Sequence, residues 1–349
     1  MFRHAVFLIL AAGALFAGSW EEKDKYHYLP GADEAARKTK RTGLVARFFK
    51  AGYPTATRFE IDVAVGGTYT AGRGTQVIVP GHAFVDAKGR KVTQKVKLEL
   101  IEVIDPLDFV TADVDLTFFN EQGGREMFQS AGMFRVNAHE LSGGAVALAP
   151  GKAVRIRFPN IRPGNEFSVY RHDAEGKWKL HGHNQEIDGR GITIGTRRYT
   201  IDALNTWWNF DVPKPEGACA KGRVVKADGS TAKNYTVYSI GISYKGTFSR
   251  RIQTGAAFRV NVHKSQQARF LVIEDTGQIG ISATVATTDK TGFDGNEEGP
   301  QNFCQEIGEI KIAAVDELIL SDKKRLSDYL GLEVKEYKVN YEDKGNRVP

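Results

Sequence analysis

One stretch of the chain gathers oxygen-bearing side chains around glycines, and it is the first place to look for metal chemistry. Calcium takes about six to eight oxygen ligands from a flexible loop. The loop is therefore a candidate calcium site, although the prediction for the chain is that it has no cofactor. The spacing lacks the alternating acids of an EF-hand, so a solvated acidic loop without an ion stays the alternative. The residues of this candidate site are Asp289, Asp294, Asn296 and Glu297.

A second acidic cluster comprises Asp105, Asp108, Asp113 and Asp115. Paired carboxylates perform acid–base chemistry in glycosidases, so a hydrolase is one hypothesis, and it requires Asp113 and Asp115 to face each other across a cleft. The two residues alternate with apolar neighbours, as solvent-facing residues of a strand would. We therefore predict no catalytic residues and a chain that is not an enzyme.

Two further groups of residues deserve comparison with known chemistry. His181 and His183 occupy alternate positions, which point the same way on a strand, but no third metal ligand is indicated. The sequence contains no GxSxG, HExxH or P-loop pattern. Trp207 and Trp208 form the chief aromatic cluster, which is a candidate surface for a sugar or a protein partner. Their position just before the predicted linker favours packing between domains instead.

The N-terminus and the two cysteines bear on the cellular location. Residues 1–19 combine Arg3, an apolar run and small residues before a cleavage point, which is typical of a signal peptide. A buried N-terminal helix is the alternative. In an exported chain, Cys219 and Cys304 predict a disulfide, as opposed to two buried thiols. We therefore expect a protein of the bacterial periplasm or cell surface.

The charge of the chain is positive but spread out. Lys and Arg total 48 against 42 Asp and Glu, a net charge of +6, without a long basic tract. A diffuse excess favours weak attraction to anionic polymers or membrane surfaces and not nucleic-acid recognition. After the leader, no apolar run is long enough to span a bilayer, so no membrane span is expected in the mature chain.

Short segments of alternating polarity, separated by glycine-rich turns, predict an all-β chain of two tandem β-sandwiches with short flanking helices. Val154, Ile156 and Phe158, for example, alternate with arginines. A helix capped by Ser321 and stopped by Gly331 is expected in the tail. The predicted divisions are a signal peptide (1–19), a helical lead-in (20–57), a first sandwich (58–210), a linker (211–217), a second sandwich (218–313) and a helical tail (314–349).

An ordered set of segments in the first sandwich resembles ZU5-like domains of bacterial envelope proteins. The segments are Gly74–Pro80, Ala83–Asp86, Ser130–Ala138 and Leu148–Lys152. In the second sandwich, three segments resemble the prealbumin-like fold of carboxypeptidase regulatory domains. These are Gly222–Val225, Phe258–Val262 and Cys304–Ile310. Such modules are structural or adhesive in most proteins, so the resemblance implies a class of protein and not a particular ligand.

Together these observations predict a non-enzymatic, exported structural or interaction protein of the bacterial cell envelope. Rigid sandwiches would display loops and helices to a protein assembly. A carbohydrate-binding or cell-wall-binding module is the alternative function, with a polysaccharide as the partner. The sequence leaves the oligomeric state open.

Overall fold

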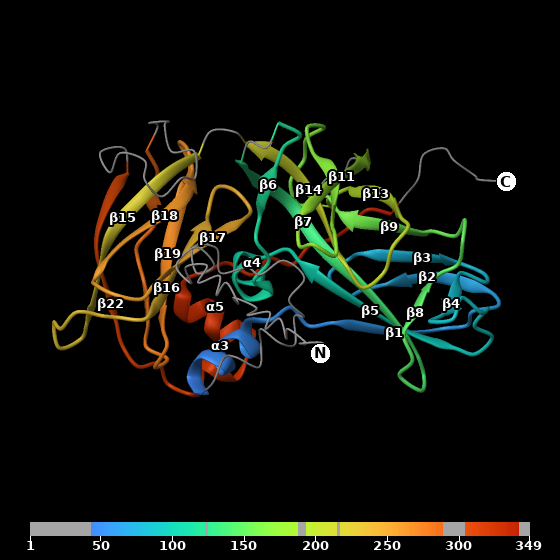
Figure 1. Cartoon of the computed structure of the whole chain (residues 1–349), viewed down its shortest axis with the longest axis horizontal. Coiled ribbons are helices and arrows are strands. Elements are labelled where there is room, and N and C mark those ends of the chain that lie inside the picture. Colours follow the sequence, from blue (N-terminus) through green and yellow to red (C-terminus); the bar gives the residue numbers. More distant parts are fainter. Residues whose placement is uncertain (1–42, 123–124, 188–192, 215–216, 289–303, 342–349) are drawn as a thin grey trace, which may run out of the picture.

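The computed structural model describes residues 43–122, 125–187, 193–214, 217–288 and 304–341. The fold is all-β, as predicted: two groups of strands lie side by side, and short helices flank the region between them (Figure 1). The predicted signal peptide and most of the helical lead-in lie outside the described residues. In the part of the chain that the structure describes, every helix is too short or too polar to serve as a membrane span.

The first sandwich is built from two large sheets and a small strand pair. Sheet I pairs, in spatial order, β1 (Thr57–Ile61), β5 (Val96–Val103), β7 (Arg125–Glu140), β14 (Trp207–Lys214), β10 (Ser168–His172) and β11 (Trp178–His183), with β6 (Thr117–Phe119) also on β7. Sheet II pairs β12 (Gln185–Ile187), β13 (Thr196–Ile201), β9 (Val154–Pro159), β3 (Gln76–Pro80) and β2 (Gly66–Thr70). The small pair is β4 (Phe84–Asp86) with β8 (Val146–Leu148).

The second sandwich consists of two smaller sheets. Sheet III pairs β18 (Ala257–His263), β15 (Gly217–Lys226) and β22 (Gln305–Ile312). Sheet IV pairs β17 (Thr247–Ile252), β16 (Tyr235–Gly241), β19 (Gln267–Glu274) and β20 (Ile279–Ile281), with β21 (Val285–Ala286) also on β19. The pairing of β15 with β22 is parallel, and the other strand pairs of this sandwich are antiparallel.

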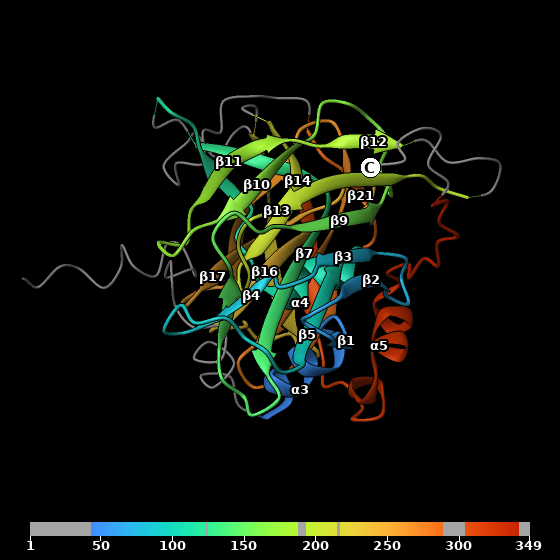
Figure 2. The same cartoon turned by 90° about the vertical axis from the view of Figure 1, so that its right-hand side faces the viewer.

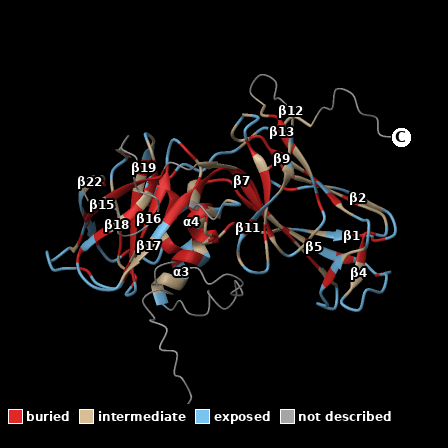
Figure 3. Ribbon diagram, turned by 45° about the horizontal axis from the view of Figure 1, so that its top comes forward, coloured by how far each residue is buried: buried red, intermediate tan, exposed pale blue. Residues whose placement is uncertain are grey.

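The apolar core is continuous from one sandwich to the other. One buried cluster joins Phe128 and Trp207 of the first sandwich to Phe258 and Phe270 of the second. Buried residues accordingly run through both groups of strands and through helix α4 (Pro106–Ala112) between them (Figure 3). At this junction, burial lowers the pKa of His263 to about 4, so its ring is neutral and its Nε2 lies 3.0 Å from the Phe128 carbonyl oxygen.

The predicted linker 211–217 is wrong, because ordered strands occupy it up to Lys214 and again from Gly217. Strand β14 continues to Lys214 and pairs with β7 there, including the Pro213–Phe128 pair. Proline has no backbone N–H to donate to a neighbouring strand. Pro213 is tolerated because β14 pairs with its other neighbour, β10, only as far as Asp211, so no strand on that side needs a hydrogen bond from residue 213.

The helices differ from the sequence prediction in two details. Helix α4 falls where the sequence predicts no helix. Helix α5 (Lys323–Leu330) begins one residue later than predicted, because Asp322 and not Ser321 caps it: the Asp322 carboxylate accepts a hydrogen bond from the Arg325 amide at 2.9 Å. Gly331 ends the helix with φ of 59°, as predicted.

The first described helix packs on the second sandwich, although it precedes the first sandwich in the sequence. Helix α3 (Gly43–Gly52) buries Phe48 and Phe49 in a cluster with Leu271 of β19 and Leu326 of α5. A short 3-10 helix, η2 (Ile319–Ser321), belongs to the same layer. The helices therefore cover the outer face of sheet IV near the junction (Figure 1).

Candidate functional site

The junction between the sandwiches holds the most concentrated group of buried charges among the described residues. Asp105 lies just before helix α4 and Asp108 lies in its first turn, so the start of this helix fixes both carboxylates. The amides of Ile104 and Asp105 donate to Asp108 Oδ2 at 3.1 and 2.9 Å. Negative side chains in this position also interact favourably with the helix dipole.

Two cations from distant parts of the chain neutralise these carboxylates. Arg73 Nη1 lies 2.6 Å from Asp108 Oδ2, and the same guanidinium group pairs with Asp105. Lys323 of α5 pairs with Asp108 Oδ1 and lies 3.7 Å from Asp105 Oδ2. The Lys335 amide donates to Asp105 Oδ1 at 3.3 Å. We call Arg73, Asp105, Asp108 and Lys323 the junction ion cluster.

The cluster favours charge pairing over proton transfer. Burial opposes ionisation of Asp108, but Lys323 and Arg73 outweigh it and hold the pKa of that carboxyl below its ordinary value. Burial raises the pKa of Asp105 and of Glu102, whose carboxylate accepts a hydrogen bond from the Thr75 hydroxyl. The cluster thus ties the first sandwich to α5 and to the C-terminal segment (residues 331–341), and α5 in turn packs on sheet IV of the second sandwich.

The other two aspartates of the acidic cluster have local roles. Asp113 ends helix α4 in the left-handed conformation, with φ of 53°. Asp115 Oδ1 accepts a hydrogen bond from the Thr117 amide at 2.9 Å. Both side chains are half-buried. These contacts explain the two residues as turn-forming groups and lend no support to the hydrolase hypothesis.

The histidine pair is split by a bulge in β11. His181 lies at the irregularity in the β10–β11 register, while His183 pairs with Ser168. The His181 ring bonds the Tyr199 hydroxyl in sheet II at 2.5 Å and Asp202 at 3.2 Å, whereas His183 Nδ1 lies 3.0 Å from the Ser168 hydroxyl. The rings therefore do not converge, and no set of three or more His, Cys, Asp or Glu side chains suited to a metal was found in the described ranges.

Tyr199, His181 and Asp202 are connected by side-chain contacts in the order of a nucleophile, a base and an acid that orients the base. Burial and the Asp202 charge raise the pKa of the Tyr199 hydroxyl, although Arg171 acts in the opposite direction. A raised pKa makes the hydroxyl a poorer nucleophile. The contact is better explained as a link between sheets I and II at the edge of the sandwich.

The predicted sugar or partner surface at Trp207 and Trp208 is wrong, because both rings are buried. Their exposed fractions are 4% and 0%. Strand β14 lies between β7 and β10 in sheet I, and both faces of that sheet are covered, so successive side chains enter different cores. Trp207 packs in the core that spans the two sandwiches, in agreement with the alternative of packing between domains.

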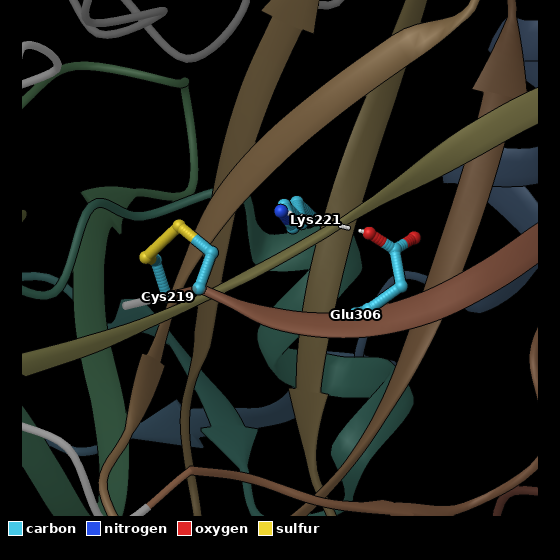
Figure 4. The surroundings of a disulfide bond; sticks show 4 residues. Cys219, Lys221 and Glu306 are labelled. Carbon is cyan, nitrogen blue, oxygen red and sulfur yellow. Dashed lines mark ion pairs between the residues drawn. A yellow bond between two sulfur atoms is a disulfide. The ribbon is translucent and has the colours of Figure 1, made fainter. Parts of the chain in front are cut away.

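The predicted disulfide is present. Cys219 in β15 is bonded to Cys304, which immediately precedes β22 (Figure 4). The next residues of the parallel pair carry an ion pair, with Lys221 Nζ 3.8 Å from Glu306 Oε2. The bond therefore fixes the point where β15 and β22 begin to pair. The candidate calcium ligands Asp289, Asp294, Asn296 and Glu297 lie outside the described residues.

Strand β14 also carries a buried acid that no pattern in the sequence singles out. Asp211 is fully buried, and neither carboxyl oxygen has a hydrogen-bond partner within the described structure. The nearby Ser130 hydroxyl donates to Asn209 Oδ1 at 2.7 Å instead. Burial raises the pKa of Asp211 well above its ordinary value. The signal in the sequence is weak: Asp211 follows three aromatic residues, Trp207, Trp208 and Phe210, but the polar Asn209 lies among them.

Replacing Asp211 with asparagine should stabilise the protein, and increasingly so as the pH rises. The pKa of Asp211 is higher in the folded protein than in the unfolded chain, so folding is favoured at low pH, where the carboxyl is protonated. The free energy of unfolding then decreases as the pH rises towards the folded-state pKa. We expect Asp211→Asn to gain about 1–3 kcal/mol at neutral pH. Urea unfolding between about pH 5 and pH 8 measures this. The control is Asp62→Asn, at an exposed position; equal pH dependence in both variants would refute the explanation.

Comparisons with known proteins place the chain in no family. No protein family matches it, and no curated protein is recognisably related to it. Among solved structures, the γ-CGTase of alkalophilic Bacillus clarkii is similar at 11% identity and a TM-score of 0.18. That alignment covers 79% of this chain and 43% of the other, so the chain spans less than half the length of that protein. A similarity this low carries no argument about function.

Proposed function

We propose that the chain is a non-enzymatic, exported interaction protein of the bacterial cell envelope. Its two sandwiches, of ZU5-like and carboxypeptidase-regulatory-like type, would act as one rigid unit that presents surfaces to a protein assembly. A disulfide-bonded cysteine pair is compatible with export, since such bonds persist in oxidising compartments.

The observation that carries this proposal is the junction ion cluster together with the core that continues across it. Asp108 is completely buried and pairs with Arg73 of the first sandwich and Lys323 of α5. A group of this kind needs both cations in place, because a buried charge that loses its partner is strongly destabilising. The cluster fixes α5 to the first sandwich, α5 packs on sheet IV, and the shared core joins the sandwiches directly. Such a rigid arrangement suits a display protein better than a mobile catalytic cleft.

Two measurements on protein isolated from its own host test the proposal. Mass spectrometry should find a mature N-terminus at Trp20 and no alkylatable thiol at Cys219 or Cys304. Mild crosslinking before purification should then link the protein to a defined envelope protein in a constant ratio. An uncleaved leader with two free thiols would contradict export. Saturable binding of a neutral sugar without any crosslinked protein would favour the carbohydrate-binding alternative.

A further inference from the structure

The C-terminal segment ends in an extended stretch that packs on the first sandwich. Tyr337, Val339 and Tyr341 occupy alternate positions, and Lys338 between the first two is exposed. Val339 forms a parallel bridge with Ile194, just before β13. Figure 2 views the molecule from the side on which β9, β13, β3 and β2 lie, with the C-terminal segment drawn in red. The stretch therefore has the form of a strand added to the first sandwich.

The backbone of Ile194 holds the segment as a neighbouring strand would. The Ile194 amide donates to the Lys338 carbonyl at 2.8 Å. The Ile194 carbonyl accepts a hydrogen bond from the Asn340 amide at 2.7 Å. In strand addition, main-chain hydrogen bonds of this kind supply affinity, and pockets for alternate side chains supply specificity.

The alternate side chains meet the turn between β2 and β3 and the core beside it. The Tyr341 hydroxyl donates to the Gly74 carbonyl, and Tyr337 packs against the core of the first sandwich. A Cβ atom at position 74 would collide with Val339 Cγ2, so the absence of a side chain at Gly74 allows the segment to approach this closely. The surface thus selects for the side chains at positions 337, 339 and 341.

The charged groups beneath the segment keep other partners when it leaves. Arg157 Nη1 donates to the Tyr341 carbonyl at 3.4 Å, and it also donates to Gln76 Oε1 at 3.5 Å. Asp105 accepts a hydrogen bond from the Lys335 amide, and it retains both cations of the junction ion cluster. Release of the segment therefore avoids the large destabilisation of a buried charge without a partner. The groups that contact the segment form what we call the docking surface: Gly74, Asp105, Arg157 and Ile194.

We propose that the docking surface binds an extended segment of a partner protein, in competition with the C-terminal segment of the same chain. The partner segment would repeat the pattern of Tyr337, Val339 and Tyr341, with aromatic residues at its first and fifth positions and a β-branched residue at the third. Residues 333–336 are exposed in succession, so the C-terminal segment can leave while α5 stays on sheet IV. This inference rests on the proposed function, because it names the surface through which the protein assembly would bind.

The test measures binding of a free peptide with the sequence of residues 333–341 to the oxidised, full-length mature protein by fluorescence anisotropy. The wild type should bind the peptide weakly, because the tethered segment competes at a high effective concentration. Val339→Ser removes the apolar contact at Gly74 and should raise the affinity about tenfold, since the docking surface is then free in a larger fraction of molecules. The matched control is Lys338→Ser, on the exposed side of the segment, which should bind like the wild type.

Two modified peptides test the strand-like pairing without altering the protein. N-methylation at the residue that matches Asn340 removes the amide that bonds the Ile194 carbonyl, whereas N-methylation at the residue that matches Val339 modifies an amide outside this pair of hydrogen bonds. We expect the first peptide to bind the Val339→Ser protein about tenfold more weakly than the second. In the same variant, hydrogen exchange should show that the unmodified peptide protects the Ile194 amide.

Several results would overturn the inference. These are failure of the peptide to bind the Val339→Ser protein, and equal binding of a peptide with the same residues in shuffled order. Wild-type dimers that dissociate when the peptide is added would assign the docking surface to exchange of C-terminal segments between two copies. The envelope crosslinks are scored separately: peptide binding without crosslinks would contradict the proposed function and leave the binding site, whereas crosslinks without peptide binding would do the reverse.

Discussion

Reducing the Cys219–Cys304 bond should lower the free energy of unfolding by about 4–5 kcal/mol. The two residues are 85 positions apart, so the bond closes a long loop in the unfolded chain and removes much of its conformational entropy. It also anchors β22 against β15, and parallel pairing of these strands depends on bringing distant segments together. This loss is a large fraction of the stability of a typical domain.

Denaturant unfolding of the oxidised and the reduced wild type measures the effect with the sulfur atoms still in place. The variant Cys219→Ala/Cys304→Ala, with and without reductant, is the control, since reductant should not change its stability. The slope of the unfolding transition should also steepen on reduction, because the unfolded chain becomes less compact. A difference below about 1 kcal/mol between oxidised and reduced wild type would contradict the chain-entropy explanation.

Replacing Lys323 with methionine should destabilise the protein by about 3 kcal/mol, the lower end of the range for a broken buried pair. The methionine side chain keeps most of the apolar stem, while Asp108 keeps only Arg73 as its cation. Because Asp108 is completely buried, water cannot replace the missing charge. Thermal and urea unfolding measure the loss.

The neighbouring residue provides a matched control. Lys324 has a side chain that is 80% exposed and pairs with Asp328 on the surface, so Lys324→Met should change stability by less than about 0.5 kcal/mol. The pKa of Asp108 is lower in the folded protein than the ordinary value for aspartate. The ion pairs of the cluster therefore stabilise the fold at pH values above that ordinary pKa. This stabilisation is lost as the pH falls through the folded-state pKa, where Asp108 becomes protonated. The difference between Lys323→Met and wild type should narrow in acid; a constant difference would contradict the ion-pair explanation.

The fold class could be predicted from the sequence because it depends on local alternation. The segment around Ile156 has the period of a strand with one covered face, and it forms β9. The same logic failed at Trp207 and Trp208, since a strand in the middle of a doubly covered sheet buries consecutive residues. An uninterrupted apolar run is the usual signal for such a strand. Asn209 and Asp211 interrupt the aromatic residues of β14, so the sequence does not distinguish it from a strand at the surface.

The junction ion cluster could be predicted only in part. The sequence shows Asp105 and Asp108 as an acidic group, but Arg73 lies 32 positions from Asp105 and Lys323 lies 215 positions from Asp108. Such pairs depend on how two sandwiches and a C-terminal helix come together, which no local pattern contains.

The docking of α3 on sheet IV has a consequence for the order of events during synthesis. Phe48 and Phe49 leave the ribosome before the first sandwich, yet their partners Tyr238 and Leu271 belong to the second. The helix must therefore remain undocked until the second sandwich has been translated. A fragment that starts at residue 217 would keep α5 and η2 on β16 and β19 but would lose Phe48 and Phe49 from that layer. A cut between the sandwiches thus removes part of the second core, although the sheets alone suggest a simple division into two.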